Sequence, residues 1–277
     1  MAPTGVSIVI LSYERLGALR ALLEGLLAQD LTGLEIELLV CNNSSAVRLR
    51  TSPFITLGRL LGRFPDLKIF NSSHNWLCRV RYTVATLARH DLILFLDDDL
   101  IPVHPRLIRQ MVDLQTTLRP NDILSCWTAL WTRWDDTHLT KVRMGFLYPQ
   151  TTEVTECDYV GPGVCMFNKQ ILFHPAILNL PEEFHRSDSA WFPWLTAMEL
   201  GSRKFYLPSY GMLRVHPESR RSALASLPGF RDGQYAAYKR MWKRGYTPVL
   251  ATERHQGRTD TPEARAAQSL RTETDAW

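Results

Sequence analysis

Long apolar runs and glycine-rich loops are missing from this chain of 277 residues. No stretch approaches the roughly 20 apolar residues that a membrane-spanning helix needs. The first fifteen residues carry no basic stretch before their short apolar run, which is not typical of a signal peptide. The net charge of +4 is too small to indicate nucleic acid, so we expect no nucleic-acid partner. It does suit an anionic ligand or a weakly attracting anionic membrane surface.

Cysteine motifs are missing as well, because the five cysteines include no CxxC pair and their number is odd. This argues against a disulfide framework or a zinc ribbon, and it indicates reduced thiols in a cytoplasmic protein. No GxGxxG follows the first predicted strand, so a dinucleotide oxidoreductase is poorly supported. A nucleotidyltransferase is disfavoured for a related reason, since the segment SYERLGALR has one glycine and no basic glycine-rich loop.

Apolar runs typical of buried strands alternate with helical patterns in the first half of the chain. Strands are predicted at residues 7–11, 36–41, 67–70 and 92–96, and helices at 16–28 and 79–89. This alternation indicates an α/β fold with a mostly parallel central sheet flanked by helices. Polar clusters at 12–14, 42–45 and 97–99 each follow a strand, so we expect them on one rim, where such sheets bind ligands.

The second half has fewer clear strand–helix units, and we expect it to form a smaller sheet continuous with the first. Strands are predicted at 158–167, broken by Gly-Pro-Gly, and at 204–207 and 212–215, with a helix at 189–198 interrupted by Pro193. The predicted organisation is one domain made of two halves, 1–120 and 121–250, followed by a polar, mobile tail at 251–277.

Three adjacent carboxylates, Asp97, Asp98 and Asp99, stand directly after the strongest predicted strand. Such neighbours repel each other unless a counter-charge is present. Mn²⁺ or Mg²⁺ takes carboxylate oxygens and readily shares a bound diphosphate, which it stabilises as a leaving group. The alternative is a solvated loop or a cluster at the start of a helix.

The order SIVILSYER, VCNNSS, an arginine-containing helix and LILFLDDDL resembles the nucleotide-binding half of the GT-A fold, and most of all the family 2 glycosyltransferases. The resemblance covers roughly residues 5–216. It implies that a sugar moves from a nucleoside-diphosphate sugar, by analogy a UDP-sugar, to a hydroxyl of a glycan, a lipid-linked or a small-molecule acceptor. It also implies assistance by a metal ion. The half at 1–120 is then the nucleotide-sugar-binding half, and the half at 121–250 contributes the acceptor-binding side with its smaller sheet.

The resemblance assigns roles to particular residues. It implies donor binding by Ser12, Tyr13, Glu14, Asn42, Arg81, Asp97 and Asp98, and metal binding by Asp99 and His216. Asp188 is implied as the general base of an inverting reaction, with a helix N-cap as the alternative. Acceptor binding is expected at Gly161 and Gly163, with a β-bulge as the alternative, and at Trp191 and Trp194.

Departures from the family pattern keep other functions open. Asn42 stands where the family usually has aspartate, and Ser187 where it usually has glutamate, which leaves a non-catalytic sugar- or nucleotide-binding protein as an alternative. The region around Trp76 together with the acidic triplet also resembles exostosin-type glycosyltransferases, which retain the anomeric configuration.

Two aromatic segments have competing interpretations. Trp127, Trp131 and Trp134 recur at helical spacing, which favours a helix face packed on the core over a sugar-stacking surface. Residues 230–246 interleave aromatic and basic side chains. They fit a helix packed on the domain, and the alternative is peripheral contact with a membrane.

Overall fold

The structure is a computed structural model that describes residues 4–46, 48–49, 60, 62–134, 138–149, 152–184, 188–221, 228, 230–252, 261–263 and 272–276. Its strands are β1 (Thr4–Ser12), β2 (Leu34–Asn42), β3 (Asp66–Asn71), β4 (Leu92–Asp97), β5 (Leu100–Pro102), β6 (Ile123–Ser125), β7 (Trp127–Trp134), β8 (His138–Gly145), β9 (Thr155–Cys157), β10 (Tyr159–Val160), β11 (Val164–Asn168), β12 (Lys204–Tyr206), β13 (Leu213–Val215) and β14 (Thr272–Ala276). Its α-helices are α1 (Leu16–Leu27), α3 (Val80–Thr86), α4 (Leu107–Gln115), α5 (Pro175–Leu178), α6 (Asp188–Leu200) and α7 (Phe230–Lys243). Short 3₁₀ helices are η2 (Leu77–Arg79), η3 (Lys169–Phe173), η4 (Glu182–Phe184), η5 (Pro217–Arg221) and η7 (Val249–Ala251).

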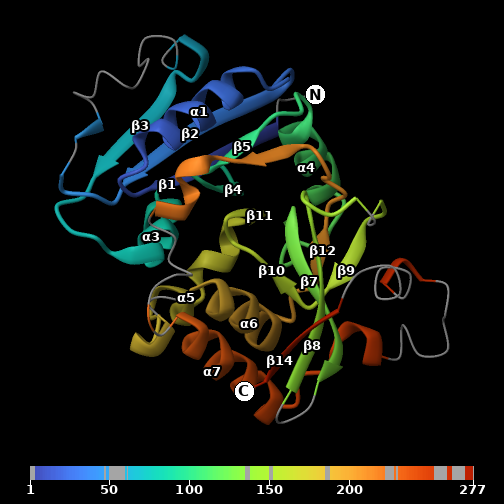
Figure 1. Cartoon of the computed structure of the whole chain (residues 1–277). Coiled ribbons are helices and arrows are strands. Elements are labelled where there is room, and N and C mark those ends of the chain that lie inside the picture. Colours follow the sequence, from blue (N-terminus) through green and yellow to red (C-terminus); the bar gives the residue numbers. More distant parts are fainter. Residues whose placement is uncertain are drawn as a thin grey trace.

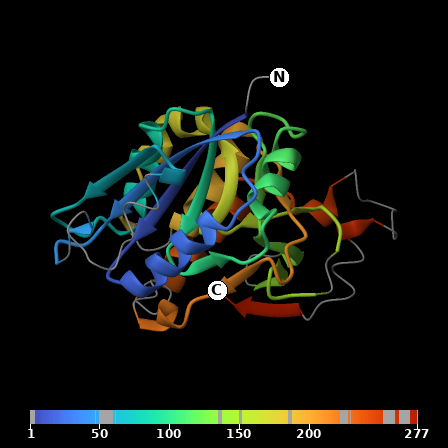
Figure 2. The ribbon, with the colours of Figure 1, turned by 90° about the horizontal axis from the view of Figure 1, so that it is seen from above.

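An eight-stranded sheet, ordered β3-β2-β1-β4-β11-β6-β12-β9, connects the two halves of the chain (Figure 1). The first four of these strands are parallel, and β11 then pairs antiparallel with β4. Figure 2 shows the twist of this sheet from above. The mixed α/β fold with a mainly parallel sheet that the sequence predicts is therefore confirmed.

Alternate side chains of β1 enter two separate cores, one on each face of the sheet. Ile8 and Ile10 pack with the apolar faces of α1 and α4, whereas Val9 packs on the side of α3, α5 and α6. This is the two-sided burial expected of a strand that is apolar at successive positions. The polar residues Ser12, Asn42 and Asp97 stand at the ends of β1, β2 and β4, beyond the apolar part of each strand.

A second sheet, ordered β10-β7-β8-β14, stands beside the main one. It contains Trp127, Trp131 and Trp134, so the predicted helix face is wrong: all three lie on strand β7, which pairs antiparallel with β8. A register shift between Trp131 and Arg133 marks an irregularity in this pairing. The predicted strand at 158–167 is also corrected, because the Gly-Pro-Gly segment separates β10 from β11 and places them in different sheets.

The predicted mobile tail needs a partial correction. Thr272–Ala276 forms β14, which pairs antiparallel with β8 from Val142 to His138. A backbone ladder of this kind ties the end of the chain to the second sheet. Of the remaining residues after 250, only 251–252 and 261–263 lie within the described part.

Candidate functional site

Three strand ends meet at one rim of the main sheet. Ser12 at the end of β1 pairs in register with Asn42 at the end of β2, and Leu11 pairs with Asp97 at the end of β4. The polar clusters that follow these strands therefore lie on the same edge, as the alternation of strands and helices predicts. Parallel strands have this consequence because their carboxyl ends face the same way.

The loop after β1 is held against the acidic triplet by its backbone. The Tyr13 N–H donates to Asp98 Oδ2 over 3.2 Å, and Tyr13 itself is half-buried. Glu14 is exposed and has a φ of 58°, a left-handed conformation that is uncommon for a residue other than glycine. Its carboxylate accepts a long hydrogen bond of 3.5 Å from the Ser44 hydroxyl in the turn after β2. Backbone strain at Glu14 thus turns the chain towards the triplet.

Arg15 is the residue of this site that sequence reasoning missed. Its Nη2 lies 2.5 Å from Asp98 Oδ1, and its Nη1 lies 2.5 Å from Asp99 Oδ2. The forked guanidinium therefore bridges two neighbouring carboxylates. The available signal was the position of a basic residue directly after the SYE cluster, in the loop that faces the triplet.

Burial and charge act in opposite directions on the triplet. Burial raises the pKa of Asp98 to about 7, although Arg15 works against this shift. Burial also raises the pKa of Asp99, with Asp97 adding repulsion and Arg15 again opposing. For Arg15 the carboxylates outweigh burial, so its pKa is raised. Arg15 thus favours the ionised form of both carboxyl groups, against the effect of burial.

Arg81 connects the triplet with the start of α6. Its Nη2 lies 2.9 Å from Asp97 Oδ1, and its Nη1 donates to the Pro162 carbonyl over 3.1 Å. Its Nε lies 3.9 Å from Asp188 Oδ2, and that oxygen accepts a hydrogen bond of 3.0 Å from the Tyr82 hydroxyl. Burial opposes the charge of Arg81, but Asp97 and then Asp188 help to raise its pKa well above the ordinary value.

Asp188 is the first residue of α6 and is only 3% exposed. Burial raises its pKa, and Arg81 and the Tyr82 hydrogen bond partly offset the effect. A carboxylate whose pKa is raised towards neutrality suits proton transfer. Its place at the start of a helix also agrees with the alternative of a helix-start residue, so the position alone does not separate the two roles.

Asparagines fix the turn after β2 against the loop that leads to Arg81. Asn42 is buried, and its Nδ2 donates to Asn71 Oδ1 over 3.0 Å. Asn43, another residue absent from the predicted site, donates to Asn75 Oδ1 and to the Leu77 carbonyl, both over 2.9 Å. It also accepts from the Trp76 N–H. These bonds position the loop from which α3 and its arginine start.

His216 follows β13 and reaches the triplet through its backbone. Its N–H donates to the Asp99 carbonyl over 2.8 Å, and its Nδ1 accepts from the Glu218 N–H over 3.2 Å. The Glu218 carboxylate in turn accepts from the Ala18 N–H at the start of α1. The segment after β13 is thereby fixed across the ends of β4 and α1.

Carboxylate oxygens are suitable ligands for Mn²⁺ or Mg²⁺, and the side chain of Asp97 is 32% exposed against 12% for Asp99. Within the described ranges, no group of three or more His, Cys, Asp and Glu side chains is arranged to hold a metal ion. Asp97 and Asp99, which pair with Arg81 and Arg15 here, are the carboxylates of this rim that could contribute ligands to a cation. They do not fit a metal centre made by the protein alone.

The predicted glycines approach the site closely. A Cβ on Gly163 would lie 2.4 Å from Asp97 Oδ2, so this position has room only for glycine as long as Asp97 keeps its place. A Cβ on Gly161 would lie 2.7 Å from the Trp127 ring. Trp127 is half-buried and packs near the half-buried Tyr148, with ring centroids 6.1 Å apart.

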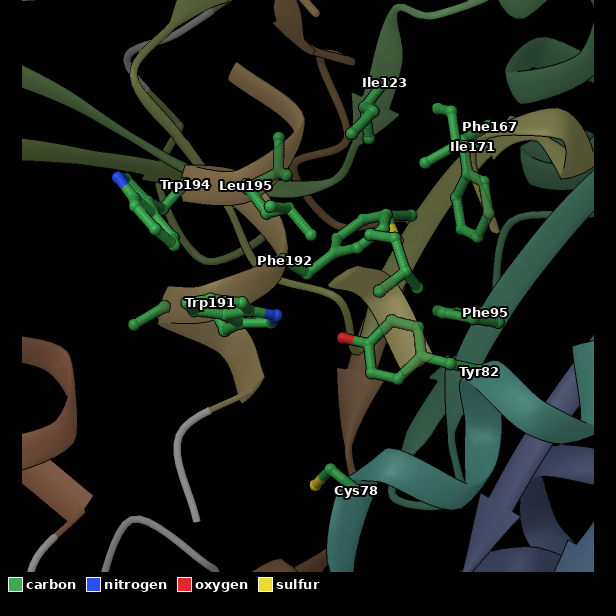
Figure 3. Packing of buried hydrophobic residues seen from close by; sticks show 14 of the residues in the cluster. Cys78, Tyr82, Phe95, Ile123, Phe167, Ile171, Trp191, Phe192, Trp194 and Leu195 are labelled. Atoms are coloured by element: carbon green, nitrogen blue, oxygen red, sulfur yellow. The ribbon is translucent and has the colours of Figure 1, made fainter. Parts of the chain in front are cut away.

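Trp191 and Trp194 do not form an accessible platform. They are 6% and 5% exposed, their ring centroids are 4.6 Å apart, and Trp191 also packs on Phe184. Figure 3 shows both side chains on α6 within the apolar cluster that includes Phe192. The expectation that they stack on an acceptor is corrected, because their faces are covered by the core.

The helix predicted within 230–246 is α7, which packs against α6 (Figure 1). It buries Ala237, Tyr238 and Met241 and leaves Lys239 and Arg240 exposed. This agrees with a helix packed on the domain. In the described residues, no helix combines the length and the apolar character required to span a bilayer.

Comparison with known proteins gives the family. The structure is similar to S. aureus TarS 1–349 in complex with UDP-GlcNAc, at a TM-score of 0.61 and 14% identity over 84% of this chain and 65% of that one. Full TarS gives 0.55 at 14% identity, over 84% of this chain and 39% of TarS, so the chain spans well under half of that protein. GalNAc-T7 with UDP, GalNAc and Mn²⁺ gives 0.54 at 13% identity, over 77% of this chain and 44% of that one.

These likenesses show the fold, which is GT-A, the fold of nucleotide-sugar glycosyltransferases. Residues 7–172 match the profile described as glycosyl transferase family 2, which covers more than half of the chain. The protein belongs to this family. No curated protein matches it in sequence.

Proposed function

We propose that this glycosyltransferase moves a sugar from a UDP-sugar to a hydroxyl acceptor with inversion at the anomeric carbon. The observation that carries the proposal is the line Asp97–Arg81–Asp188, in which one buried arginine connects the donor rim with a buried carboxylate at the start of α6. Arg81 thereby fixes the distance between Asp97, which we propose binds the donor, and Asp188, which we propose accepts a proton.

In the proposed reaction, Asp188 accepts the proton of the acceptor hydroxyl while the hydroxyl oxygen attacks the anomeric carbon. The bond from that carbon to the diphosphate breaks, and UDP leaves with the electron pair. Ser12, Tyr13, Glu14 and Asn42 line the nucleoside side, and Asp97 and Arg81 meet the ribose and the diphosphate. Asp98 supports donor binding indirectly, because it is buried and holds Tyr13 and Arg15 of the loop after β1. A bound Mn²⁺ or Mg²⁺ would be held by Asp97 or Asp99, with His216 as a proposed further ligand, and would neutralise charge on the leaving group.

The UDP assignment is supported by solved structures of the same fold that contain UDP-GlcNAc or UDP. We would measure thermal unfolding with a panel of UDP-sugars, each with and without Mn²⁺, because a ligand that binds only the folded state raises the unfolding temperature. One UDP-sugar should stabilise the protein, and more so with Mn²⁺. Stabilisation by a purine nucleotide sugar alone would contradict the assignment.

The role of Asp188 is tested by Asp188→Asn, with Asp113→Asn on the exposed side of α4 as the control. Loss of a general base lowers the rate by about 10²–10⁴, so transfer should fall by that factor while UDP binding persists. Unchanged turnover would reject the base role. The anomeric configuration of the product, read by NMR, separates inversion from the retaining alternative. UDP-sugar binding without transfer or hydrolysis would favour the non-catalytic alternative.

On the acceptor side, we propose Gly161 and Gly163 with Trp127 in place of the buried tryptophans of α6. Trp127 is half-buried beside Gly161, and its indole offers a ring face of the kind that stacks on sugars. Trp127→Leu should raise the KM for the acceptor and leave the KM for the donor unchanged. An equal change in both KM values would assign Trp127 a structural role.

A cytoplasmic location stays part of the proposal, and the five cysteines, all free and buried, agree with reduced thiols. Peripheral membrane contact through α7 is a further proposal compatible with this location, because α7 exposes Lys239, Arg240 and Trp242. Co-sedimentation with phosphatidylserine vesicles at low and high salt tests it. Salt-sensitive binding that is lost in Lys239→Glu would favour the membrane.

A further inference from the structure

We propose that Arg15 makes cation binding conditional on the nucleoside diphosphate, because it holds Asp99 until both ligands are present. This inference rests on the proposed donor function. It concerns a positioning residue that neither the predicted site nor the family pattern includes. Its basis is the bridge from one guanidinium to two carboxylates, with both contacts at 2.5 Å and the Arg15 side chain only 14% exposed.

The two contacts of Arg15 are not equivalent. The Asp98 side chain is 0% exposed and also accepts the Tyr13 N–H, so it is fixed from two sides. The Asp99 side chain is 12% exposed, and the other side chain that hydrogen-bonds to it is the hydroxyl of Ser219 in η5. Asp99 is thus the more accessible of the two carboxylates that Arg15 holds. Arg15 can therefore release Asp99 while Asp98 retains its guanidinium.

A divalent cation at Asp99 competes for the oxygen that Arg15 Nη1 binds. Arginine stays charged throughout the range in which proteins are studied, so a cation that arrives alone displaces one positive charge and then lies beside it. A diphosphate that arrives alone meets the carboxylates of the triplet. Each ligand by itself is thus disfavoured by charge.

Together the two ligands remove both conflicts. The cation takes the carboxylate of Asp99, and the freed arm of the guanidinium meets phosphate oxygens, for which its forked donors are suited. Binding of the cation and of the diphosphate then becomes positively coupled. By thermodynamic linkage, each ligand must raise the affinity for the other by the same factor.

The test measures Mn²⁺ affinity by electron paramagnetic resonance, with and without UDP, in the full chain. The variants are Arg15→Gln, which removes the charge, and Arg15→Lys, which keeps it. Arg20→Gln is the matched control, because Arg20 lies one turn further along α1 on the exposed surface and pairs with Glu24. Circular dichroism and thermal unfolding establish that each variant is folded.

In the wild type, UDP should raise Mn²⁺ affinity strongly. Arg15→Gln should bind Mn²⁺ alone about tenfold more tightly than the wild type, because one charged group that competes for Asp99 is lost. UDP should still raise its Mn²⁺ affinity through the phosphate ligands, but by a smaller factor than in the wild type. Arg15→Lys keeps the charge but loses the fork, so its Mn²⁺ affinity without UDP should lie between those of the wild type and Arg15→Gln. Arg20→Gln should equal the wild type.

Equal Mn²⁺ affinity of Arg15→Gln and the wild type without UDP would overturn the inference and leave the donor function standing. Weaker Mn²⁺ binding in Arg15→Gln would overturn it as well, since Arg15 would then only organise the carboxylates. If Arg15→Gln does not fold, wild-type Mn²⁺ affinity that does not respond to UDP overturns the inference by itself. A wild type that binds neither Mn²⁺ nor UDP would instead refute the proposed function.

Discussion

Replacement of Gly163 by alanine should weaken nucleotide binding far more than it weakens the fold. The added Cβ would lie 2.4 Å from Asp97 Oδ2, whereas ordinary contact begins at 3.4 Å, so the carboxylate has to move by about 1 Å. The strand cannot yield in its place, because the Asp97 N–H donates to the Gly163 carbonyl over 2.7 Å. The movement therefore falls on the bond of 2.9 Å between Asp97 and Arg81.

A displaced Asp97 should also lose one charged hydrogen bond to the donor that we propose it binds, which corresponds to about 1.5–3 kcal/mol, or about a ten- to hundredfold weaker affinity for UDP. Overpacking reduces stability by about 1–3 kcal/mol, and a mobile carboxylate should keep the value near the lower limit. Isothermal titration calorimetry with UDP and Mn²⁺, together with urea denaturation, measures both effects.

The control for this experiment is Gly62→Ala, where an added Cβ has no neighbour within 4 Å. It should leave UDP affinity unchanged. If Gly163→Ala binds UDP as tightly as the wild type does, the position of Asp97 is not what the donor recognises. The reasoning from the strand-end carboxylate to the donor would then fail.

Three other substitutions probe the buried parts of the structure. Trp191→Ala should lower the free energy of unfolding by about 3–5 kcal/mol in urea denaturation, because it removes a core ring; a selective loss of transfer at full stability would restore the platform interpretation. Asn43→Ala should weaken UDP binding and lower stability by about 1–3 kcal/mol, since three partners lose their bonds, and unchanged calorimetry would contradict this. Burial raises the pKa of Asp158 from 3.8 to about 6. The folded state therefore holds this proton more tightly, and wild-type stability should fall by up to about 3 kcal/mol as pH rises between those two values. In urea denaturation at a series of pH values, Asp158→Asn should lose this slope, and parallel slopes would refute the assignment.

Much of the donor side could be read from the sequence because it depends on local patterns. The apolar runs that became β1, β2 and β4 are recognisable without any tertiary knowledge, and polar clusters directly follow them. Parallel pairing then places the clusters on one rim whatever the details of packing. The choice of Arg81, on a helix before the acidic triplet, depended instead on the resemblance to family 2 glycosyltransferases.

Local patterns misled where two structures share a spacing. The tryptophans from Trp127 to Trp134 fit helical periodicity, but β7 carries them because its pairing with β8 outweighs the pattern. Trp191 and Trp194 on α6 were expected to bind an acceptor, because nothing in the local sequence indicates that they are buried. Whether an aromatic residue faces a ligand or the core depends on neighbours that come from distant segments, here Phe184 and the cluster around Phe192.

The sequence by itself determined the α/β class, the positions along the chain of the strands that form the rim and the presence of crowded acids after one of them, since each follows from short-range patterns. Only the tertiary structure decided which charges meet. Arg15 and Asp99 are 84 residues apart in the chain, and Arg81 and Asp188 are further apart still. Coulomb interactions depend on the distance between charges in space, and for residues far apart in the chain this distance is set by the tertiary structure.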